Sequence, residues 1–347
     1  MTRSACSGAS GTDIPADIEY MHSDMNPIRL GVITNPAAMH NERFPYTHKR
    51  LEKRLAQAGD AVLTASLGEI DDAVRTLLVD RGINVLGING GDGTIHSTIG
   101  AVIGLLQANP GIARPTLLLL NGGTYNIASR AMRTNHNPVD TLRRFQARWG
   151  GQPVEKVSTR ELGLLEVRTE EGRTLTGMVF GSQVIANALE LCDEIGGGYS
   201  GFSRFLLRGV AGYAFKTPFF RENKWRLQHR ADPIIVDSTA GNRTVGVVAS
   251  TVDVKLARGL VWALSASSPE EGFHSKTISA GNPSDVVRLV PFLLWELPHP
   301  MIVARPRTKM IRTSGNFTLD GELYPDMGPI TVTISPWRFN VVAGEDL

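Results

Sequence analysis

Residues 90–94 read Gly-Gly-Asp-Gly-Thr, and their types and spacing suit the binding of a phosphate group. Glycines at three of the first four positions let backbone N–H groups approach an anion with no Cβ atom in the way. A helix predicted over residues 94–107 would direct its positive end at the same place. Asp92 repels a phosphate unless it binds Mg²⁺ or accepts a proton. The alternative interpretation is a tight turn in which Asp92 caps the helix.

A second glycine turn, Asn-Gly-Gly-Thr-Tyr-Asn at residues 121–126, directly follows an apolar run that predicts a strand. Thr124 could donate a hydrogen bond to a phosphate, and Asn126 could orient the loop or cap the next helix. By itself this is an ordinary turn. Ligands of open α/β folds bind at the carboxyl edge of the sheet, so two glycine turns at one edge favour a nucleotide.

A third polar turn, Asp320-Gly321-Glu322, lies between the strand-like run 316–319 and Tyr324. Taken alone, it predicts a hairpin turn of the Asp-Gly type.

The elements that must position the first two turns follow from the hydrophobic pattern. Short apolar runs alternate with helical periods, which indicates βαβ units and a parallel sheet. The leucine run before the second turn suits a sheet that is covered on both faces. Strands are predicted at residues 28–35, 61–64, 84–89 and 116–120, and helices at 46–58, 69–79, 94–107 and 138–149.

The pattern changes after Gly151. Segments rich in Val, Ile and Thr are separated by Gly, Pro, Asn and Asp, as in an antiparallel β domain. These segments are 161–167, 174–180, 224–229, 233–236, 244–252, 301–303 and 330–334, with helices predicted near 183–194 and 204–213. We predict an α/β N-terminal domain with a parallel sheet, followed by a mainly antiparallel β-sandwich domain. The predicted bounds are a flexible tail at 1–27, a nucleotide-binding domain at 28–150 and a β-rich domain at 151–347.

Composition narrows the class of protein. Hydrophobic residues make up 42% and charged residues 20%, as in soluble globular proteins, and the net charge of +2 favours no particular partner. Two cysteines, Cys6 and Cys192, cannot form a disulfide framework and suggest a reducing compartment. The N-terminal tail has no apolar core of a secretory signal, and the chain has no uncharged apolar stretch of about 18 residues. The expected location is the cytoplasm.

The three motifs in this order resemble the diacylglycerol kinase catalytic superfamily, which includes sphingosine, ceramide and bacterial lipid kinases. The resemblance covers nearly the whole chain, from Asn35-Pro36 through the two glycine turns to Asp320-Gly321-Glu322. It implies an N-terminal domain that binds ATP with Mg²⁺ and a C-terminal β-sandwich that accepts a lipid with a free hydroxyl.

The resemblance also implies roles for single residues. Glu322 would be the base that removes the proton of the lipid hydroxyl. Asp92 is the second candidate, because sphingosine kinases give that role to the Asp of the glycine loop. The residues implied for ATP are Asn35, Thr64, Gly90, Gly91, Asp92, Gly93, Thr94, His96, Gly123, Thr124 and Asn126, with Asp92 as the ligand of Mg²⁺.

The chain departs from the superfamily at several positions. Ser97 and Ile127 stand where the superfamily often has acidic residues, and Glu271-Gly272 stands where bacterial members often have Asp-Asp-Gly for a structural Mg²⁺. The lysine of the usual Asn-Pro-x-Ser-Gly-Lys start is also missing. His96 and Ile127 match sphingosine kinases better than diacylglycerol kinases. These departures remove some of the metal ligands that the resemblance implies. They slightly favour ceramide or a sphingoid base as the acceptor.

Residues 202–230 interleave aromatic and basic side chains, with Glu222 as the one acidic residue among them. Such a composition suits transient contact with an anionic membrane surface, so we expect peripheral membrane association. The alternative is a set of core aromatics beside a solvated basic face. The apolar run 290–297 would line a lipid pocket or form core. No nucleic-acid motif is present, so no nucleic-acid partner is expected.

The leading hypothesis is an ATP-dependent lipid kinase that transfers the γ-phosphate to a hydroxyl of ceramide, a sphingoid base or diacylglycerol. One alternative is a soluble NAD kinase, since NAD kinases share the first glycine motif. The other is a non-catalytic lipid-binding relative that has lost key carboxylates.

Overall fold

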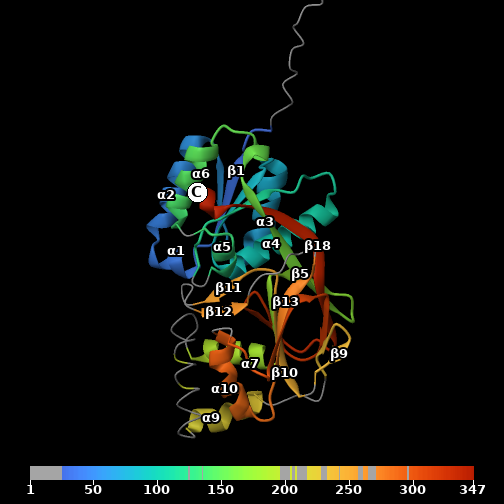
Figure 1. Ribbon diagram of the computed structural model, residues 1–347. Coiled ribbons are helices and arrows are strands. Elements are labelled where there is room, and N and C mark those ends of the chain that lie inside the picture. The colour runs from blue at the N-terminus through green and yellow to red at the C-terminus, as the bar shows by residue number, and fades with distance from the viewer. Residues whose placement is uncertain are drawn as a thin grey trace, which may run out of the picture.

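The computed structural model describes residues 26–123, 126–134, 136–195, 204, 208, 217–227, 233–241, 243–256, 261–264, 271–294 and 297–347. The upper part of Figure 1 is built from helices and parallel strands, and the lower part is mainly antiparallel.

The upper part has a parallel sheet in the order β2-β1-β3-β4. Its strands are β1 (Leu30–Thr34), β2 (Ala61–Thr64), β3 (Val85–Asn89) and β4 (Thr116–Leu119). Alternate residues of each strand face opposite sides. Both sides are apolar: Val32 packs in one core and Ile33 in the other. A sheet with two apolar faces must be covered on both.

Two layers of helices provide that cover. On one face lie α2 (Tyr46–Ala58) and α6 (Pro138–Trp149), and on the other lie α3 (Ile70–Arg75), its π-helical continuation Thr76–Asp80 and α4 (Asp92–Ala108). Shorter helices connect them: α1 (Met39–Arg43), α5 (Ile127–Ala131) and the 3₁₀ turns Leu67–Glu69, Val154–Lys156 and Gly344–Asp346.

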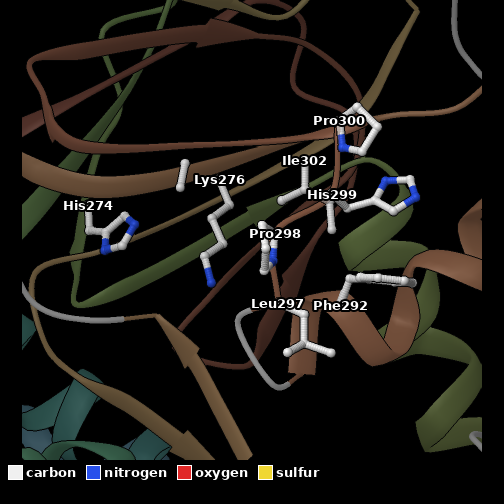
Figure 2. Close-up of a pocket in the computed structure, with 9 residues that line it drawn as sticks. His274, Lys276, Phe292, Leu297, Pro298, His299, Pro300 and Ile302 are labelled. Carbon is white, nitrogen blue, oxygen red and sulfur yellow. The ribbon is translucent and has the colours of Figure 1, made fainter.

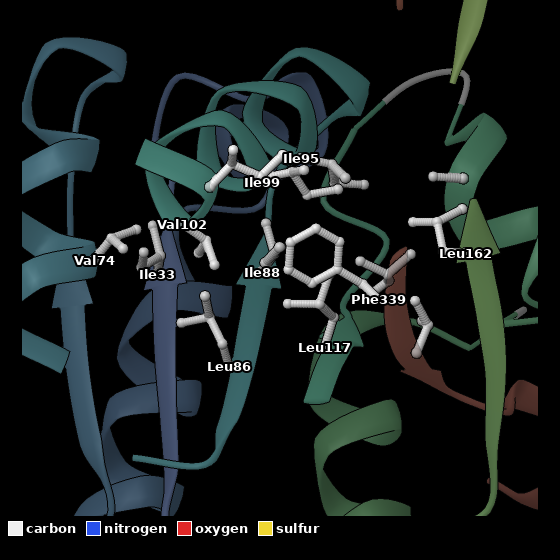
Figure 3. Close-up of a cluster of buried hydrophobic side chains, with 14 of the residues drawn as sticks. Ile33, Val74, Leu86, Ile88, Ile95, Ile99, Val102, Leu117, Leu162 and Phe339 are labelled. Carbon is white, nitrogen blue, oxygen red and sulfur yellow. The ribbon is translucent and has the colours of Figure 1, made fainter. Parts of the chain in front are cut away.

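The last long strand, β18 (Ile330–Val342), joins the two parts of the molecule (Figure 1). It runs parallel to β4 where Val341 faces Leu117, and it pairs antiparallel with β5 (Thr159–Thr169) along nearly its whole length. Figure 3 shows Phe339 of β18 among the side chains that pack under α4. The C-terminal strand therefore completes the core of the N-terminal part.

Beyond β18 the same sheet continues with antiparallel strands. These are β6 (Thr174–Gly177), β15 (Met310–Thr313), β8 (Ile235–Val236) and β9 (Thr239–Ala240). A second sheet packs against it in the order β14-β13-β10-β7-β16-β17. Its strands are β7 (Val179–Ser182), β10 (Thr244–Ser250), β13 (Phe273–Ser279), β14 (Ile302–Thr308), β16 (Phe317–Leu319) and β17 (Glu322–Tyr324). Phe180 and Phe317 of the second sheet meet Val332 of the first in a shared core. This is a β-sandwich.

The outer face of the second sheet carries α7 (Val184–Glu194) and α10 (Pro283–Leu294), which share a small apolar core with β10 and β13. Also present are α9 (Pro218–Asn223) and the hairpin pair β11 (Val254–Leu256) and β12 (Val261–Leu264). The strand predicted at residues 224–229 is wrong, because Lys224–Leu227 form a 3₁₀ turn. The helix predicted near 204–213 falls almost entirely outside the described residues.

The predicted fold class is confirmed: an α/β part with a parallel sheet precedes a mainly antiparallel β-sandwich. The bounds of the two domains remain a prediction, to which the structure adds that β5 and β18 contribute to both cores. No helix within the described ranges is long and apolar enough to cross a bilayer.

Candidate active site

The first glycine turn closes directly onto helix α4, which begins at Asp92 with Gly91 as its N-cap residue. A Cβ atom at Gly90 would lie 2.4 Å from Oγ1 of Thr94, so only glycine fits this position. The Thr94 hydroxyl in turn accepts a hydrogen bond of 2.9 Å from the side-chain amide of Asn35. The turn is thereby tied to the loop that follows β1.

The second glycine turn lies against the first. A Cβ atom at Gly123 would stand 2.2 Å from Cα of Gly91, and one at Gly122 would stand 2.7 Å from the backbone nitrogen of Gly90. Two backbones approach this closely only where both lack side chains. The prediction that two glycine turns share one sheet edge is therefore confirmed for these residues, whereas Thr124 lies outside the described residues.

Asn126 fixes the shape of the second turn. Its side-chain oxygen accepts a hydrogen bond of 2.9 Å from the N–H of Gly123, and its amide nitrogen donates one of 2.9 Å to the carbonyl of the same glycine. Asn126 itself has a φ of 50°, which Asn tolerates better than most residues. The amide thus orients the loop, one of the two roles that the sequence suggested for it.

Asp92 lies at the junction of the two turns. Burial raises its pKa to about 6, and the negative charge of Asp320 adds to that effect. Hydrogen bonds from the backbone N–H groups of Ile127, Ala128 and Asn126 lower the pKa of Asp92 in part. The hydrogen bond from Ala128 to Oδ1 of Asp92 measures 3.3 Å. The residue is therefore a carboxyl group whose protonation changes near neutral pH.

The third polar turn is a two-residue hairpin that connects β16 and β17, with Leu319 opposite Glu322. Asp320 and Gly321 have φ values of 53° and 91°, as the primed turns of tight hairpins require. The hairpin places Glu322 over the start of α4, since a Cβ atom at Gly93 would lie 2.7 Å from Oε1 of Glu322. The carboxylate of the β-rich part and the glycine turn of the α/β part therefore face each other.

Asp320 connects the hairpin to both parts. Its Oδ1 accepts hydrogen bonds of 2.8 Å from the N–H groups of Met178 and Val179, and its Oδ2 lies 3.0 Å from Nδ1 of His96. The other ring nitrogen of His96 is 3.4 Å from the hydroxyl of Tyr324. Burial alone would lower the pKa of His96, but the hydrogen bond and charge of Asp320, with the charge of Glu322, raise it above its usual value.

Two residues of this network, Asp320 and Tyr324, are not among the predicted site residues. Asp320 pairs with a histidine 224 positions away, and no local pattern reports such a contact. Asn41 was also missed. It donates from its side chain to the carbonyls of Asn35 and Asn89, and so holds the loop after β1 against the end of β3.

Thr64 lies farther out than the other predicted residues. It ends the edge strand β2, in register with Thr34 of β1, which in turn pairs with Asn89 of β3. Two strand spacings of about 4.8 Å therefore separate Thr64 from the glycine turn. Its hydroxyl lies 3.0 Å from a ring nitrogen of His48.

The residues at this site fit a Mg²⁺ ion that is bound together with a nucleotide. In the part of the chain that the structure describes, no three His, Cys, Asp or Glu side chains cluster as metal ligands. Proteins commonly hold Mg²⁺ through one or two carboxylates together with substrate phosphates. Asp92 beside two side-chain-free turns fits an ion of that kind, carried in with phosphate groups.

Most of the basic and aromatic region 202–230 lies outside the described residues. Within the described part, Trp225 is 62% exposed, and Arg226 lies over its ring at 5.3 Å from the centroid. Arg226 also forms ion pairs with Glu190 and Glu194 of α7. That arginine is therefore engaged within the protein, while the tryptophan is open to solvent.

Known proteins resemble this chain in its N-terminal part and in its fold. Residues 29–151 match the family model of the diacylglycerol kinase catalytic domain, so the resemblance inferred from the motifs is confirmed. A solved diacylglycerol kinase from Bacillus anthracis str. Sterne has a TM-score of 0.55 and 14% identity, over 91% of this chain and 96% of that chain. A candidate diacylglycerol kinase from the same strain has a TM-score of 0.59 and 14% identity, over 92% and 98% of the two chains. At such identity the likeness shows the fold alone. A search of curated proteins gave no match.

Proposed function

We propose that this protein transfers the γ-phosphoryl group of ATP to a hydroxyl group of a lipid. The observation that carries the proposal is the position of Glu322. Its carboxylate comes from the β-sandwich and lies over Gly93, the second residue of the helix that begins at the glycine turn. A phosphate in the turn and a hydroxyl at Glu322 would be neighbours.

The proposed roles follow from the contacts. The turns at Gly90–Gly91 and Gly122–Gly123 offer backbone N–H groups to phosphate oxygens, with Thr94 and Asn35 keeping the first turn in shape. Phosphoryl transfer depends mainly on positioning and on neutralising charge. A bound Mg²⁺, with Asp92 as its protein ligand, would neutralise part of that charge.

Glu322 is the proposed general base. It would accept the proton of the lipid hydroxyl as the oxygen attacks the γ-phosphorus, which is the role of a carboxylate in this chemistry. The Asp320–His96 contact holds the hairpin that carries Glu322 against α4. Ceramide, a sphingoid base and diacylglycerol are the proposed acceptors, reached by transient association with an anionic membrane surface in the cytoplasm.

The test incubates the full chain with γ-labelled ATP, Mg²⁺ and each of these lipids in mixed micelles, followed by identification of the product by mass. Label in one lipid class is the expected result, and Asp92→Asn should abolish it. NADP formation from NAD without lipid labelling would instead support an NAD kinase. Lipid binding without any transfer would support a non-catalytic relative.

A further inference from the structure

Tyr324 lies two residues after Glu322 and therefore on the same face of strand β17. Glu322 lies over Gly93, and the hydroxyl of Tyr324 lies 3.4 Å from Nε2 of His96. Gly93 and His96 are three positions apart in α4, so they are neighbours on one side of the helix. The proposed base and the Tyr324 hydroxyl therefore face the same stretch of α4, from strand positions about 7 Å apart.

The side chain of Tyr324 is held at both ends. Its ring stacks on Phe317 of the neighbouring strand, with 4.9 Å between the centroids and 7° between the planes, and its hydroxyl meets His96. Burial and the charge of Glu322 raise the pKa of Tyr324 above its ordinary value, although the charge of Arg173 acts in the opposite direction. The hydroxyl therefore keeps its proton at neutral pH and can donate a hydrogen bond.

His96 determines where that proton points. Nδ1 of His96 lies 3.0 Å from Oδ2 of Asp320, so Nδ1 carries a proton and donates it to the carboxylate. Burial lowers the pKa of His96, but the hydrogen bond and charge of Asp320, with the charge of Glu322, raise it overall and favour the imidazolium. In that form Nε2–H donates to the oxygen of Tyr324, which leaves the O–H of Tyr324 directed away from the histidine. His96 and Asp320 are thus positioning residues for Tyr324.

We propose that the Tyr324 hydroxyl donates a hydrogen bond to an acyl carbonyl oxygen next to the hydroxyl that is phosphorylated. This role depends on the proposed kinase function and narrows its acceptor to the acylated lipids, diacylglycerol and ceramide. In both, the nearest carbonyl oxygen lies about five bonds from the reacting hydroxyl oxygen, a reach of about 6 Å, which is comparable to the spacing of Glu322 and Tyr324. A free sphingoid base has an ammonium group there, which cannot accept a hydrogen bond.

The carbonyl contact is separate from a cavity of about 580 Å³ on the second sheet, which His274, Phe292 and Ile302 help to line (Figure 2). His274 lies on β13 and Tyr324 on β17, and these strands are four places apart in the order of the sheet. At about 4.8 Å for each strand, about 19 Å separates them. The hydroxyl end of the lipid, held at Glu322 and Tyr324, therefore lies outside that cavity.

The experiment compares lipids that differ only in the acyl carbonyl. Dioctanoylglycerol is paired with its dioctyl ether, and N-octanoyl sphingosine with N-octyl sphingosine. Each lipid is presented to the full-length protein with γ-labelled ATP and Mg²⁺ in mixed micelles, at equal surface fraction. In at least one pair, kcat/KM should be about threefold to tenfold higher for the lipid with the carbonyl, the usual net effect of one neutral hydrogen bond.

Variants assign the preference to Tyr324. Tyr324→Phe keeps the ring on Phe317 but removes the donor, so the preference should disappear while ATP affinity in calorimetry stays unchanged. His96→Asn should lower the preference too, because its amide can still donate to Asp320 but does not reach Tyr324. Tyr46→Phe, at a tyrosine that is 73% exposed, is the matched control and should leave the preference unchanged.

The outcomes separate this role from the kinase function itself. Equal rates on both members of each pair, or a preference that survives in Tyr324→Phe, would overturn the role of Tyr324 and leave the kinase function intact. Labelling of sphingosine alone would do the same. If Tyr324→Phe does not fold, the lipid pairs on the unchanged protein decide. Absence of label in every lipid would overturn the kinase function and the role of Tyr324 with it.

Discussion

Asp92 of the α/β part and Glu322 of the sandwich lie on either side of the first glycine turn. Their surroundings differ, and the difference suggests a separate role for each carboxylate. Backbone N–H groups at the start of α5 hold Asp92, whereas Glu322 is an exposed residue of β17 that points at Gly93. A carboxylate fixed beside the glycine turns suits a cation, and one open to solvent suits a proton taken from an incoming hydroxyl. These surroundings therefore favour Glu322 as the base.

Replacing Glu322 by Gln tests this division. The amide keeps the size of the side chain but cannot accept the proton, so turnover should fall by about 10²–10⁴-fold, the usual contribution of a general base. ATP affinity, measured by calorimetry, should stay within about twofold. Glu171→Gln, in the exposed turn between β5 and β6, is the matched control. Full activity of Glu322→Gln would transfer the base role to Asp92.

The raised pKa of Asp92 predicts that fold stability and activity depend on pH. Its pKa of about 6 lies above the ordinary value of 3.8, so protonation stabilises the fold below pH 3.8 and this contribution is lost as the pH rises through 6. In the proposed function Asp92 binds Mg²⁺ in its ionised form. The ratio kcat/KM of the free enzyme should therefore increase through about pH 6.

Asp320→Asn should move that rise to lower pH. The substitution removes the negative charge that helps to raise the pKa of Asp92, while an amide oxygen can still accept from the N–H groups of Met178 and Val179. The measurement is the pH profile of kcat/KM for both proteins. A midpoint that stays in place or rises would show that the charge of Asp320 does not act on Asp92.

At the scale of elements, the two glycine turns form one structure, because Gly91 and Gly123 touch through their backbones. Gly123→Ala must push the turns apart, so we expect ATP affinity to fall by at least about tenfold. Gly104→Ala is the control within α4: apart from its chain neighbours and the backbone of its own helix, no atom lies within 4 Å of its added Cβ, and Ala is the better helix former by about 1 kcal/mol. Equal ATP affinity of both variants in calorimetry would contradict a phosphate site between the turns.

The sequence predicted elements well where periodicity and length were unambiguous. The structure has α2 and α6 at the predicted residues, as it has β2. The prediction of a strand at residues 224–229 was wrong. The sequence Lys-Trp-Arg-Leu at 224–227 alternates polar and apolar residues as a strand does, but it forms a 3₁₀ turn that packs against α7. Helix α10 was missed, since Pro291 lies inside it and Pro normally ends a helix. The Asp320–His96 contact depends on how whole sheets pack, which no local pattern contains.

The core of the α/β part and the core of the sandwich are connected, because two strands run through both. Strand β5 contributes Leu162 to the core under α4 and Val167 to the core of the sandwich, and β18 does the same with Phe339 and Val332. The same two strands pair in both cores, with one irregularity between Ile334 and Arg338, so opening of one core removes support from the other. We therefore expect the two parts to unfold together.

Phe339→Ala tests this coupling. Phe339 is 1% exposed and packs in the core of the α/β part, so its truncation should cost about 3–5 kcal/mol. Phe44→Ala, at a side chain that is 49% exposed, should cost no more than about 0.5 kcal/mol. Because the cores share β5 and β18, native-state hydrogen exchange in Phe339→Ala should lose protection equally in β3 and in β10. Loss of protection confined to β3, or two separate thermal transitions, would contradict this coupling. Either result would mean that the sandwich stays folded when the core of the α/β part has opened.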